Sequence, residues 1–418
     1  MKINTMRKID KYIGIPLCFI MSSFLKILAL FRKPQTVAVK KILFIELSEM
    51  GSAIIADPAM RKAKNHFAAD LYFVIFKKNI ASLELLKTIP HENIFTLRDD
   101  NIFLFFYDVL RFCGWCWREK FSATIDLELF SRATALLASL SGAPYRVGFY
   151  RFYNEGLYRG QIVTHRVHYN PHIHIAKNFI ALINALISNN AEVPYSKTEI
   201  TDSELVLMQV TSSSEEREVI YQKIKALAPA FSPTKNPIVL INPNASDLLP
   251  QRRWMPENFI ALVQLILTDY PHHYVLITGS PSEREQAERL REKINHPRCL
   301  NFAGQNKFTQ LPALYNVSEV MITNDSGPGH FSAVTSLQTF VLFGPETPKL
   351  YGSLGNSIPI YAGLACSPCV SAANHRETPC QNNVCLQVLT PSLVYRLVKP
   401  YLRSVEEIAQ QTNYAPTS

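Results

Sequence analysis

The chain has 418 residues, of which 47% are hydrophobic, enough for two core-forming domains of about 100–200 residues each. Its net charge of +9 favours anionic partners, and no charged block is long enough for a disordered tail. Because zinc-finger spacing, RNA-recognition signatures and long basic runs are missing, we expect no nucleic-acid partner. Phosphorylated small molecules and anionic lipid remain the favoured partners.

A strongly apolar run covers residues 12–31, so that residues 1–39 form a candidate membrane-associating segment. Basic residues lie on both sides of the run: Lys2, Arg7, Lys8 and Lys11 before it, Arg32 and Lys33 after it. This pattern favours a helix that lies in, or dips into, an anionic cytoplasmic leaflet. An alternative is a helix packed on the surface of a domain. A membrane span is disfavoured by Pro16 and Lys26, and a secretory signal by Lys26 and the lack of an A-x-A-like cleavage site.

Alternating strand and helix patterns then predict a first α/β domain over residues 40–190. The predicted strands, which are short apolar runs, cover 41–47, 71–76, 122–129 and 146–150. A helix of small residues is expected over 131–142. Such alternation is typical of βαβ units in a parallel sheet.

A polar, less regular segment, 191–235, is interpreted as an interdomain connection before a second α/β domain over 236–390. The elements predicted there are strands at 237–243, 273–279 and 339–345, helices at 254–270 and 282–294, and a strand–turn–helix over 319–336. A C-terminal helix and tail, 391–418, could cross back to the first domain. Two doubly wound halves imply a cleft, with ligands bound at the carboxyl ends of the strands.

The turn within 319–336 is the strongest chemical feature of the sequence. Asp325, Ser326 and Gly327 follow a strand and open a helix. Small residues allow a ligand close to the backbone, and the first N–H groups of a helix attract anions such as a pyrophosphate. Asp325 could also accept hydrogen bonds from sugar hydroxyls. The alternative is that Asp325 and Ser326 only cap the helix.

Several motifs in order along the chain carry a family resemblance. They are ILFIELSEMGSAIIADPAM (42–60), SLSGAPYRVGF (139–149), NPNASDLLPQRRWMPENF (242–259), ITGSPSERE (277–285), NFAGQNKFTQLPALY (301–315), NDSGPGHFSA (324–333) and VLFGPETP (341–348). From about Lys40 to Val398 the chain resembles the heptosyltransferases of glycosyltransferase family 9. The resemblance implies the GT-B fold, with two Rossmann-like domains.

The resemblance also implies a donor-binding set in the second domain. Its members are Asn242, Asn244, Arg252, Arg253, Gly279, Asp325, Ser326, Gly327 and His330. The Asp325 turn would meet the diphosphate and sugar, the arginine pair would neutralise the diphosphate, and Gly279 would let the base approach the sheet. His330 could instead support the turn, and the arginine pair could be a solvated surface feature.

The chain departs from the family at the expected general base. The family has an aspartate directly after the glycine of its first loop, whereas here Ser52 follows Gly51. A neutral serine cannot serve alone as the base, so Glu49 becomes the catalytic candidate. Glu128 is placed on the same acceptor side, and Asp57 is a weaker candidate. Glu49 could also be an ordinary loop carboxylate, or the base could be lost.

Four cysteines, Cys366, Cys369, Cys380 and Cys385, cluster with the spacing C-x2-C-x10-C-x4-C. They could hold a structural zinc ion, with His375 as a substitute ligand, form disulfides, or remain reduced thiols. No Asp-x-Asp pair is present, so we expect catalysis to require no metal or other cofactor.

By resemblance, the expected reaction is an inverting transfer of a sugar from a nucleotide-sugar, ADP-heptose by default, to a lipopolysaccharide core or similar glycolipid. The expected place is the cytoplasmic face of the inner membrane, as a peripheral or monotopic protein. The missing aspartate leaves a non-catalytic GT-B protein that binds a sugar nucleotide or assists a partner transferase as the alternative. A nicotinamide-dependent Rossmann enzyme is disfavoured because no G-x-G-x-x-G follows either first strand.

Overall fold

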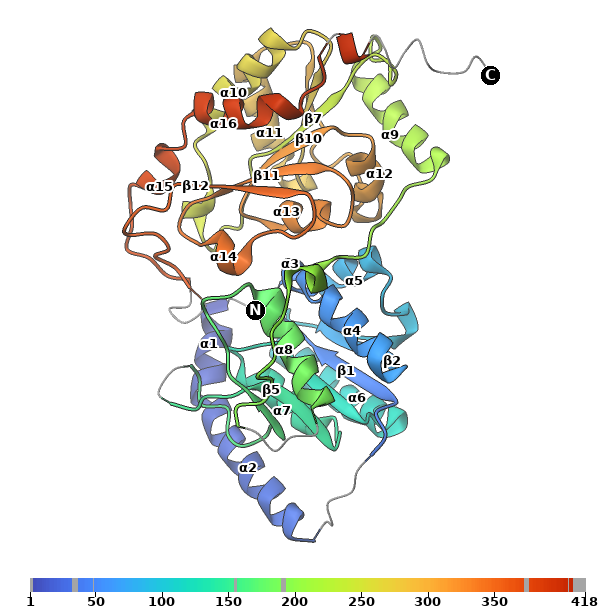
Figure 1. The fold of residues 1–418 in the computed structure, drawn as a ribbon, viewed down its shortest axis with the longest axis vertical. Helices are drawn as coiled ribbons and strands as arrows, with labels where there is room; N and C mark the ends of the chain where they lie inside the picture. The colour runs from blue at the N-terminus through green and yellow to red at the C-terminus, as the bar shows by residue number, and fades with distance from the viewer. Residues whose placement is uncertain are drawn as a thin grey trace. The chain divides into compact units, whose positions relative to one another are not determined.

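The structure is a computed structural model that describes residues 3–31, 37–47, 49–153, 156–188, 193–371, 376–404 and 406–408. Lys2, Arg32, Lys33 and His375, all named above, lie outside the described residues. The chain forms two compact units, residues 1–208 and 209–418, drawn in Figure 1 and described here one at a time.

Unit 1 is built on a six-stranded parallel sheet with the order β3-β2-β1-β4-β5-β6. The strands are β1 (Lys41–Ile45), β2 (Asp70–Phe76), β3 (Ile94–Leu97), β4 (Ala123–Asp126), β5 (Tyr145–Phe149) and β6 (His165–Val167). The central strands are almost wholly buried, as their near-continuous apolar runs predict.

Helices cover both faces of this sheet. They are α1 (Ile3–Tyr12), α2 (Gly14–Phe31), α3 (Met50–Ile55), α4 (Asp57–Phe67), α5 (Ala81–Leu86), α6 (Ile102–Glu119), α7 (Arg132–Leu140) and α8 (Ile175–Ile187). On one face, Phe112 and Cys116 of α6 and Leu137 of α7 pack into a core cluster with residues of β1 and β2. On the other face, α4 and α8 pack against each other.

Unit 2 repeats this architecture with a six-stranded parallel sheet in the order β12-β11-β10-β7-β8-β9. The strands are β7 (Ile238–Asn242), β8 (Tyr274–Ile277), β9 (Cys299–Asn301), β10 (Val320–Asn324), β11 (Gln338–Phe343) and β12 (Ser357–Tyr361). The helices are α9 (Ser214–Leu227), α10 (Pro256–Asp269), α11 (Arg284–Ile294), α12 (Leu311–Asn316), α13 (Gly327–Ser332), α14 (Pro348–Tyr351), α15 (Val384–Gln387) and α16 (Pro391–Val398).

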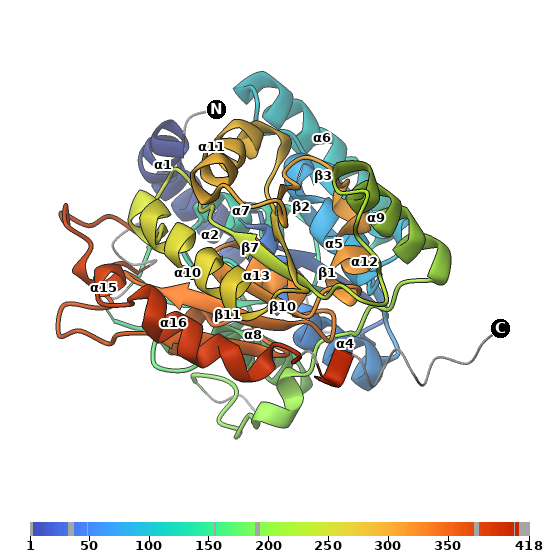
Figure 2. The same ribbon diagram turned by 90° about the horizontal axis from the view of Figure 1, so that it is seen from above.

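Two segments differ from the sequence-based expectations. The segment 191–235 contains α9, whose Lys223 donates to Gln305, Asn306 and Gln310 of unit 2, so its second half belongs to that unit. The C-terminal helix α16 belongs to unit 2, and residues 409–418 of the expected tail lie outside the described residues. The helix packs along α10, beside which it lies in both views (Figures 1 and 2), and buries Val394 and Val398 in the core of unit 2.

The predicted N-terminal helix is present, as α1 and α2, and one of its faces docks on unit 1. Asp10 accepts hydrogen bonds from the backbone N–H groups of Arg132 and Ala133, at 2.8 and 3.0 Å, and pairs with the Arg132 guanidinium at 2.9 Å. Further along, Ser22 Oγ accepts from the backbone of Gln161 at 2.8 Å. The surface-packed alternative therefore describes this face of the helix.

The opposite face of α2 stays uncovered and apolar. Its largest exposed side chains are Phe19, Ile20, Phe24, Ile27, Leu30 and Phe31. The helical stretch Thr5–Phe31 is long and apolar enough to cross a membrane, a test that signal sequences and buried core helices also pass. Pro16 lies in the first turn of α2, where proline does not break a helix.

We expect Asp10→Ala to destabilise unit 1. The variant leaves the Arg132 guanidinium, only 7% exposed, without its carboxylate, and it removes two acceptors at the start of α7. Breaking a buried pair from one side costs about 3 kcal/mol, or roughly 6–12 °C in Tm for a unit of this size. Thermal unfolding followed by circular dichroism measures the change.

The matched control is Asp202→Ala, which removes a carboxylate that is 88% exposed and pairs with Lys177. A surface pair contributes little, so the control should melt like the parent. Equal melting of the two variants would contradict the structural role of α1.

Candidate functional site

Each sheet has one point where the strand order reverses. In unit 1 this point lies between β1 and β4, and in unit 2 between β10 and β7. Open α/β sheets bind ligands outside the carboxyl ends of the strands at such a point. The loops that follow these four strands are therefore the candidate sites.

In unit 2, a buried charged cluster occupies this position. Asp325 follows β10, and its Oδ2 lies 3.4 Å from Nε of Arg252. Nη2 of the same arginine lies 2.7 Å from a carboxylate oxygen of Glu346, which follows β11. Asp325 and Glu346 are 4% and 1% exposed, so Arg252 pairs with two buried carboxylates and offsets one of their two negative charges. Arg376 adds a second cation, 3.1 Å from Glu346.

Asparagine side chains hold the neighbouring loops in place. Asn324, the last residue of β10, accepts from the backbone of Trp254 at 3.0 Å and donates to the Pro243 carbonyl at 2.8 Å. Asn242 donates to the Thr278 hydroxyl at 3.1 Å. These bonds join the loops after β7, β8 and β10, and they hold the segment that carries Arg252.

That Gly279 lets the base approach the sheet stays a prediction, and the structure shows which side chains of unit 2 lie beside this glycine. A Cβ at this position would lie 2.8 Å from the Asn244 amide and 3.1 Å from the Glu283 carboxylate. The glycine therefore makes room for side chains of unit 2 itself, and Asn244 covers it.

The turn after Asp325 opens α13, a helix of only six residues. Ser326 makes no side-chain cap bond, because its hydroxyl donates to the Asn324 carbonyl at 3.2 Å. The Ser326 side chain therefore does not cap α13. His330 is half-buried, and its Nδ1 lies 3.3 Å from the Ser353 hydroxyl. This contact fits support of the turn, and the donor-binding role of His330 stays a prediction.

The structure separates the two arginines that the sequence grouped. Arg253 donates to the Ala245 carbonyl at 2.6 Å and pairs with the exposed Asp247. It therefore braces a surface loop, while Arg252 alone joins the Asp325 cluster. Sequence reasoning missed Glu346, although a carboxylate in the short loop after a buried strand could have pointed to it.

In unit 1, acidic side chains gather after β1 and β4. Glu46 is 3% exposed and accepts from the backbone of Glu49 at 3.3 Å. Glu128, in the loop after β4, accepts from the backbone of Leu47 at 3.1 Å. The structure thus brings Glu49 and Glu128 to one loop region, as expected, and adds Glu46, which sequence reasoning did not select.

Asp57 has a structural role and is not a base candidate. It is fully buried, its Oδ1 accepts from Thr88 at 2.5 Å, and its Oδ2 accepts from the backbone of Met208 at 2.9 Å and from Arg61 at 3.0 Å. Gly51 and Ser52 lie in the first turn of α3, which begins directly after Glu49.

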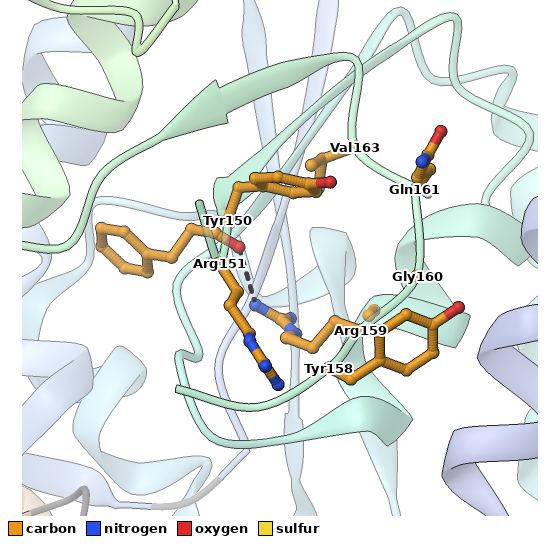
Figure 3. A pocket seen from close by; sticks show the side chains of 9 residues that line it. Tyr150, Arg151, Tyr158, Arg159, Gly160, Gln161 and Val163 are labelled. Carbon is orange, nitrogen blue, oxygen red and sulfur yellow. Dashed lines mark hydrogen bonds between the residues drawn. The ribbon is translucent and has the colours of Figure 1, made fainter. Parts of the chain in front are cut away.

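A pocket of about 250 Å³ lies in unit 1, beyond the end of β5 (Figure 3). Its lining residues are Ala135, Phe149, Tyr150, Arg151, Tyr158, Arg159, Gly160, Gln161 and Val163. The buried Arg159 pairs with Asp126 and donates to the Glu128 carbonyl at 2.7 Å. Burial raises the pKa of Asp126 to about 6, while the guanidinium of Arg159 opposes the shift.

The docked helix α2 forms a support behind this pocket. Gly160 has φ +70°, and a Cβ there would lie 2.2 Å from Ser22 Oγ and 2.7 Å from the Cys18 carbonyl. Only glycine allows this approach. The pocket wall, the loop with Glu128 and the N-terminal helix are therefore one connected part of unit 1.

The four clustered cysteines are free thiols in the structure. Among the described residues, no group of three or more His, Cys, Asp or Glu side chains is arranged to hold a metal ion. Burial, with Cys369 and Cys380 nearby, raises the pKa of Cys385. A structural zinc ion stays a prediction, which elemental analysis of the purified protein can test.

Comparison with known proteins identifies the family of the chain. The model of glycosyltransferase family 9 (heptosyltransferase) matches residues 118–379. The chain belongs to glycosyltransferase family 9. Its α/β fold class, two parallel sheets with an N-terminal apolar helix, is confirmed by this match together with the structure.

Among family 9 relatives, lipooligosaccharide heptosyltransferase 2 of Campylobacter jejuni is 27% identical over 187 residues. That match covers 44% of this chain and 56% of the relative, so the chain spans about half the length of this relative. The solved structure of ADP-heptose lps heptosyltransferase II of E. coli is similar in fold, with a TM-score of 0.65, 17% identity, and coverage of 89% of this chain and 99% of that one. The solved structure of E. coli heptosyltransferase WaaC with ADP is also similar in fold, with a TM-score of 0.59 and 14% identity. The match covers 87% of this chain and 100% of that one.

Proposed function

We propose that this chain is an inverting glycosyltransferase that moves a sugar from a nucleoside diphosphate sugar, ADP-heptose by family resemblance, to a lipopolysaccharide core or related envelope glycolipid. The observation that carries the proposal is the buried cluster of Arg252, Asp325 and Glu346 at the reversal point of the second sheet, in a chain of family 9.

The cluster suits a diphosphate leaving group. Two buried carboxylates hold Arg252 in place, so its guanidinium is oriented before a ligand arrives. A charge-assisted hydrogen bond from this guanidinium would stabilise the negative charge that develops on the diphosphate. Asp325 would accept hydrogen bonds from sugar hydroxyls. The positive charge would come from Arg252 and Arg376, both of which pair with carboxylates of the cluster.

Unit 1 would bind the acceptor. Glu49 would take the proton from the attacking hydroxyl, which then displaces the diphosphate from the opposite side of the anomeric carbon. The Arg159 pocket, close to the Glu128 loop, offers polar contacts to a saccharide. The uncovered apolar face of α2 would attach the protein to the cytoplasmic face of the inner membrane, where a lipid-linked acceptor is available.

Thermal shift with ADP, ADP-heptose and UDP-glucose tests the donor site. A ligand of the native state at 100 times its Kd stabilises that state by about 2.7 kcal/mol, so the preferred donor should raise Tm by several degrees. Arg252→Ala should lose this shift. The adjacent Arg253→Ala is the matched control, since Arg253 contacts the Ala245 loop, and it should keep the shift.

Product formation separates the two functional alternatives. A clear rise in Tm with a nucleotide-sugar, but no transfer to extracted lipopolysaccharide core, would favour the non-catalytic binding protein. This alternative rests on the serine at position 52, where the family has an aspartate. No shift with any nucleotide-sugar would contradict the donor site itself.

A further inference from the structure

Helix α6 of unit 1 presents a second uncovered apolar surface, which none of the roles above uses. Five large side chains are between 57% and 83% exposed: Phe103, Phe106, Tyr107, Leu110 and Trp117. With about 100° of rotation per residue, all five lie within an arc of roughly 100° on the helix. We call these five residues the α6 stripe.

The fold does not need this stripe. Phe112 and Cys116, on the opposite side of α6, are buried in the core cluster of unit 1, with Phe105 and Trp115 packed against it. The helix is therefore docked by one face, and the stripe faces outward. Contiguous exposed apolar surface of this kind usually marks a binding surface.

The exposed charges of α6 beside the stripe are positive, whereas Asp99, which pairs with Lys78, and the exposed Asp100 stand just before the helix. Arg111 and Arg118, whose side chains are 54% and 71% exposed, lie along one edge of it. The Arg111 guanidinium stands over the Tyr107 ring at 6.0 Å, and that of Arg98 at 5.7 Å. The acidic residues of α6 lie off the stripe. Asp108 is buried against Arg98 at 2.7 Å, and Glu119 pairs with Lys41 at 2.9 Å.

Helices α6 and α1 pack against the same core cluster of unit 1. Met6 of α1 packs against the same core cluster as Phe105 and Val109 of α6. Both α1 and α6 contact α7, and α2 follows α1 with its own uncovered apolar face. Figure 2 shows α1, α7 and α6 in unit 1.

We propose that the α6 stripe is a second membrane-contacting surface, which enters the headgroup layer of an anionic bilayer. Tryptophan and tyrosine suit this layer because they combine an apolar ring with a polar atom, and the arginines beside them would bind lipid phosphates. Two contacts, α2 and α6, hold unit 1 in one orientation on the membrane, whereas one helix alone would leave it free to rotate. The inference extends the proposed membrane attachment and does not depend on transferase activity.

The test uses the full chain and vesicles of phosphatidylglycerol and phosphatidylethanolamine. The double variant F103S/L110S should partition at least about tenfold more weakly than the parent, because two large apolar side chains no longer enter the lipid. The matched control is V219S/L227S, which removes two exposed apolar side chains from α9 of unit 2 and should bind like the parent. The nucleotide thermal shift should be unchanged in both, which separates this surface from the donor site.

Tryptophan fluorescence gives a second measurement. Trp117 is 83% exposed, whereas Trp254 is 1% exposed and Trp115 packs against the core cluster of unit 1, so brominated lipids should quench mainly Trp117 in the bound protein. W117F should remove most of that quenching. Unchanged partitioning of F103S/L110S, no quenching, or equal binding to phosphatidylcholine vesicles would overturn the proposal. So would a parent protein that dimerises in sedimentation and becomes monomeric in the double variant, because the stripe would then be an interface between copies.

Discussion

Asp325→Ala should lower sugar transfer by about 10²–10³-fold while unit 2 stays folded. The variant removes the carboxylate that orients Arg252 and that we place beside the donor sugar, and loss of one oriented electrostatic contact in an active site commonly costs 10²–10³-fold in rate. The fold should persist because Arg252 keeps its pair with Glu346. Transfer from the nucleotide-sugar, measured beside a circular dichroism melt, checks both parts.

Two companion variants sharpen the result. Asp325→Asn keeps an oxygen that accepts hydrogen bonds but removes the charge, so activity between those of the parent and the alanine variant would assign part of the effect to hydroxyl binding. Asp247→Ala removes a carboxylate that is 95% exposed and pairs with Arg253, and it should leave transfer unchanged. Activity of Asp325→Ala within a few-fold of the parent would show that the donor binds elsewhere.

Glu49→Gln should lower turnover by about 10²–10⁴-fold, the usual contribution of a general base. Glutamine keeps the size of the side chain and its hydrogen bonding but lacks the basic oxygen. The backbone N–H of Glu49, which donates to Glu46, is unaffected, so the loop should hold. The ADP thermal shift should hardly change, because Glu49 belongs to unit 1 and the diphosphate cluster to unit 2.

Ser52→Asp provides the rescue. Ser52 is the third residue of α3, in a first helical turn, where an acidic side chain is favourable. Restoring the family's aspartate in the Glu49→Gln protein should recover part of the lost turnover. A large loss without rescue would leave Glu49 required in another role, and no loss would move the base to Glu128 or Glu46.

The middle strands of both sheets could be predicted from sequence, whereas the shorter edge strands could not. β1, β2, β7 and β8 are continuous apolar runs because helices cover both of their faces. β6 and β9 have three residues each, too few for a pattern, and their pairing with a neighbouring strand defines them. Helix α6 was not predicted from the sequence, although it has apolar residues on both its buried and its exposed sides.

For the candidate site, the key residues could be found from the local sequence, but the residues with which they form ion pairs could not. The turn at Asp325 could be found because small residues between a strand and a helix indicate close ligand approach. The ion pairs of Arg252 with Asp325 and with Glu346 could not be predicted, because each joins residues far apart in the sequence. Adjacent Arg252 and Arg253 differ because Arg252 pairs with residues far along the chain, whereas Arg253 pairs with Asp247 in the loop just before it.

The sequence alone determined what depends on local pattern. It specified two α/β units, the turn after β10, the serine at position 52 and an apolar N-terminal helix. The tertiary structure decided which carboxylates are structural and which are candidates for chemistry. Asp57 is held by Thr88, Arg61 and Met208, whereas Glu49 lies at the start of α3. The tertiary structure also decided that Asp10 of the N-terminal helix forms an ion pair with Arg132. Such choices need the long-range approach of two segments, since a carboxylate's environment, and not its residue type, sets what it can do.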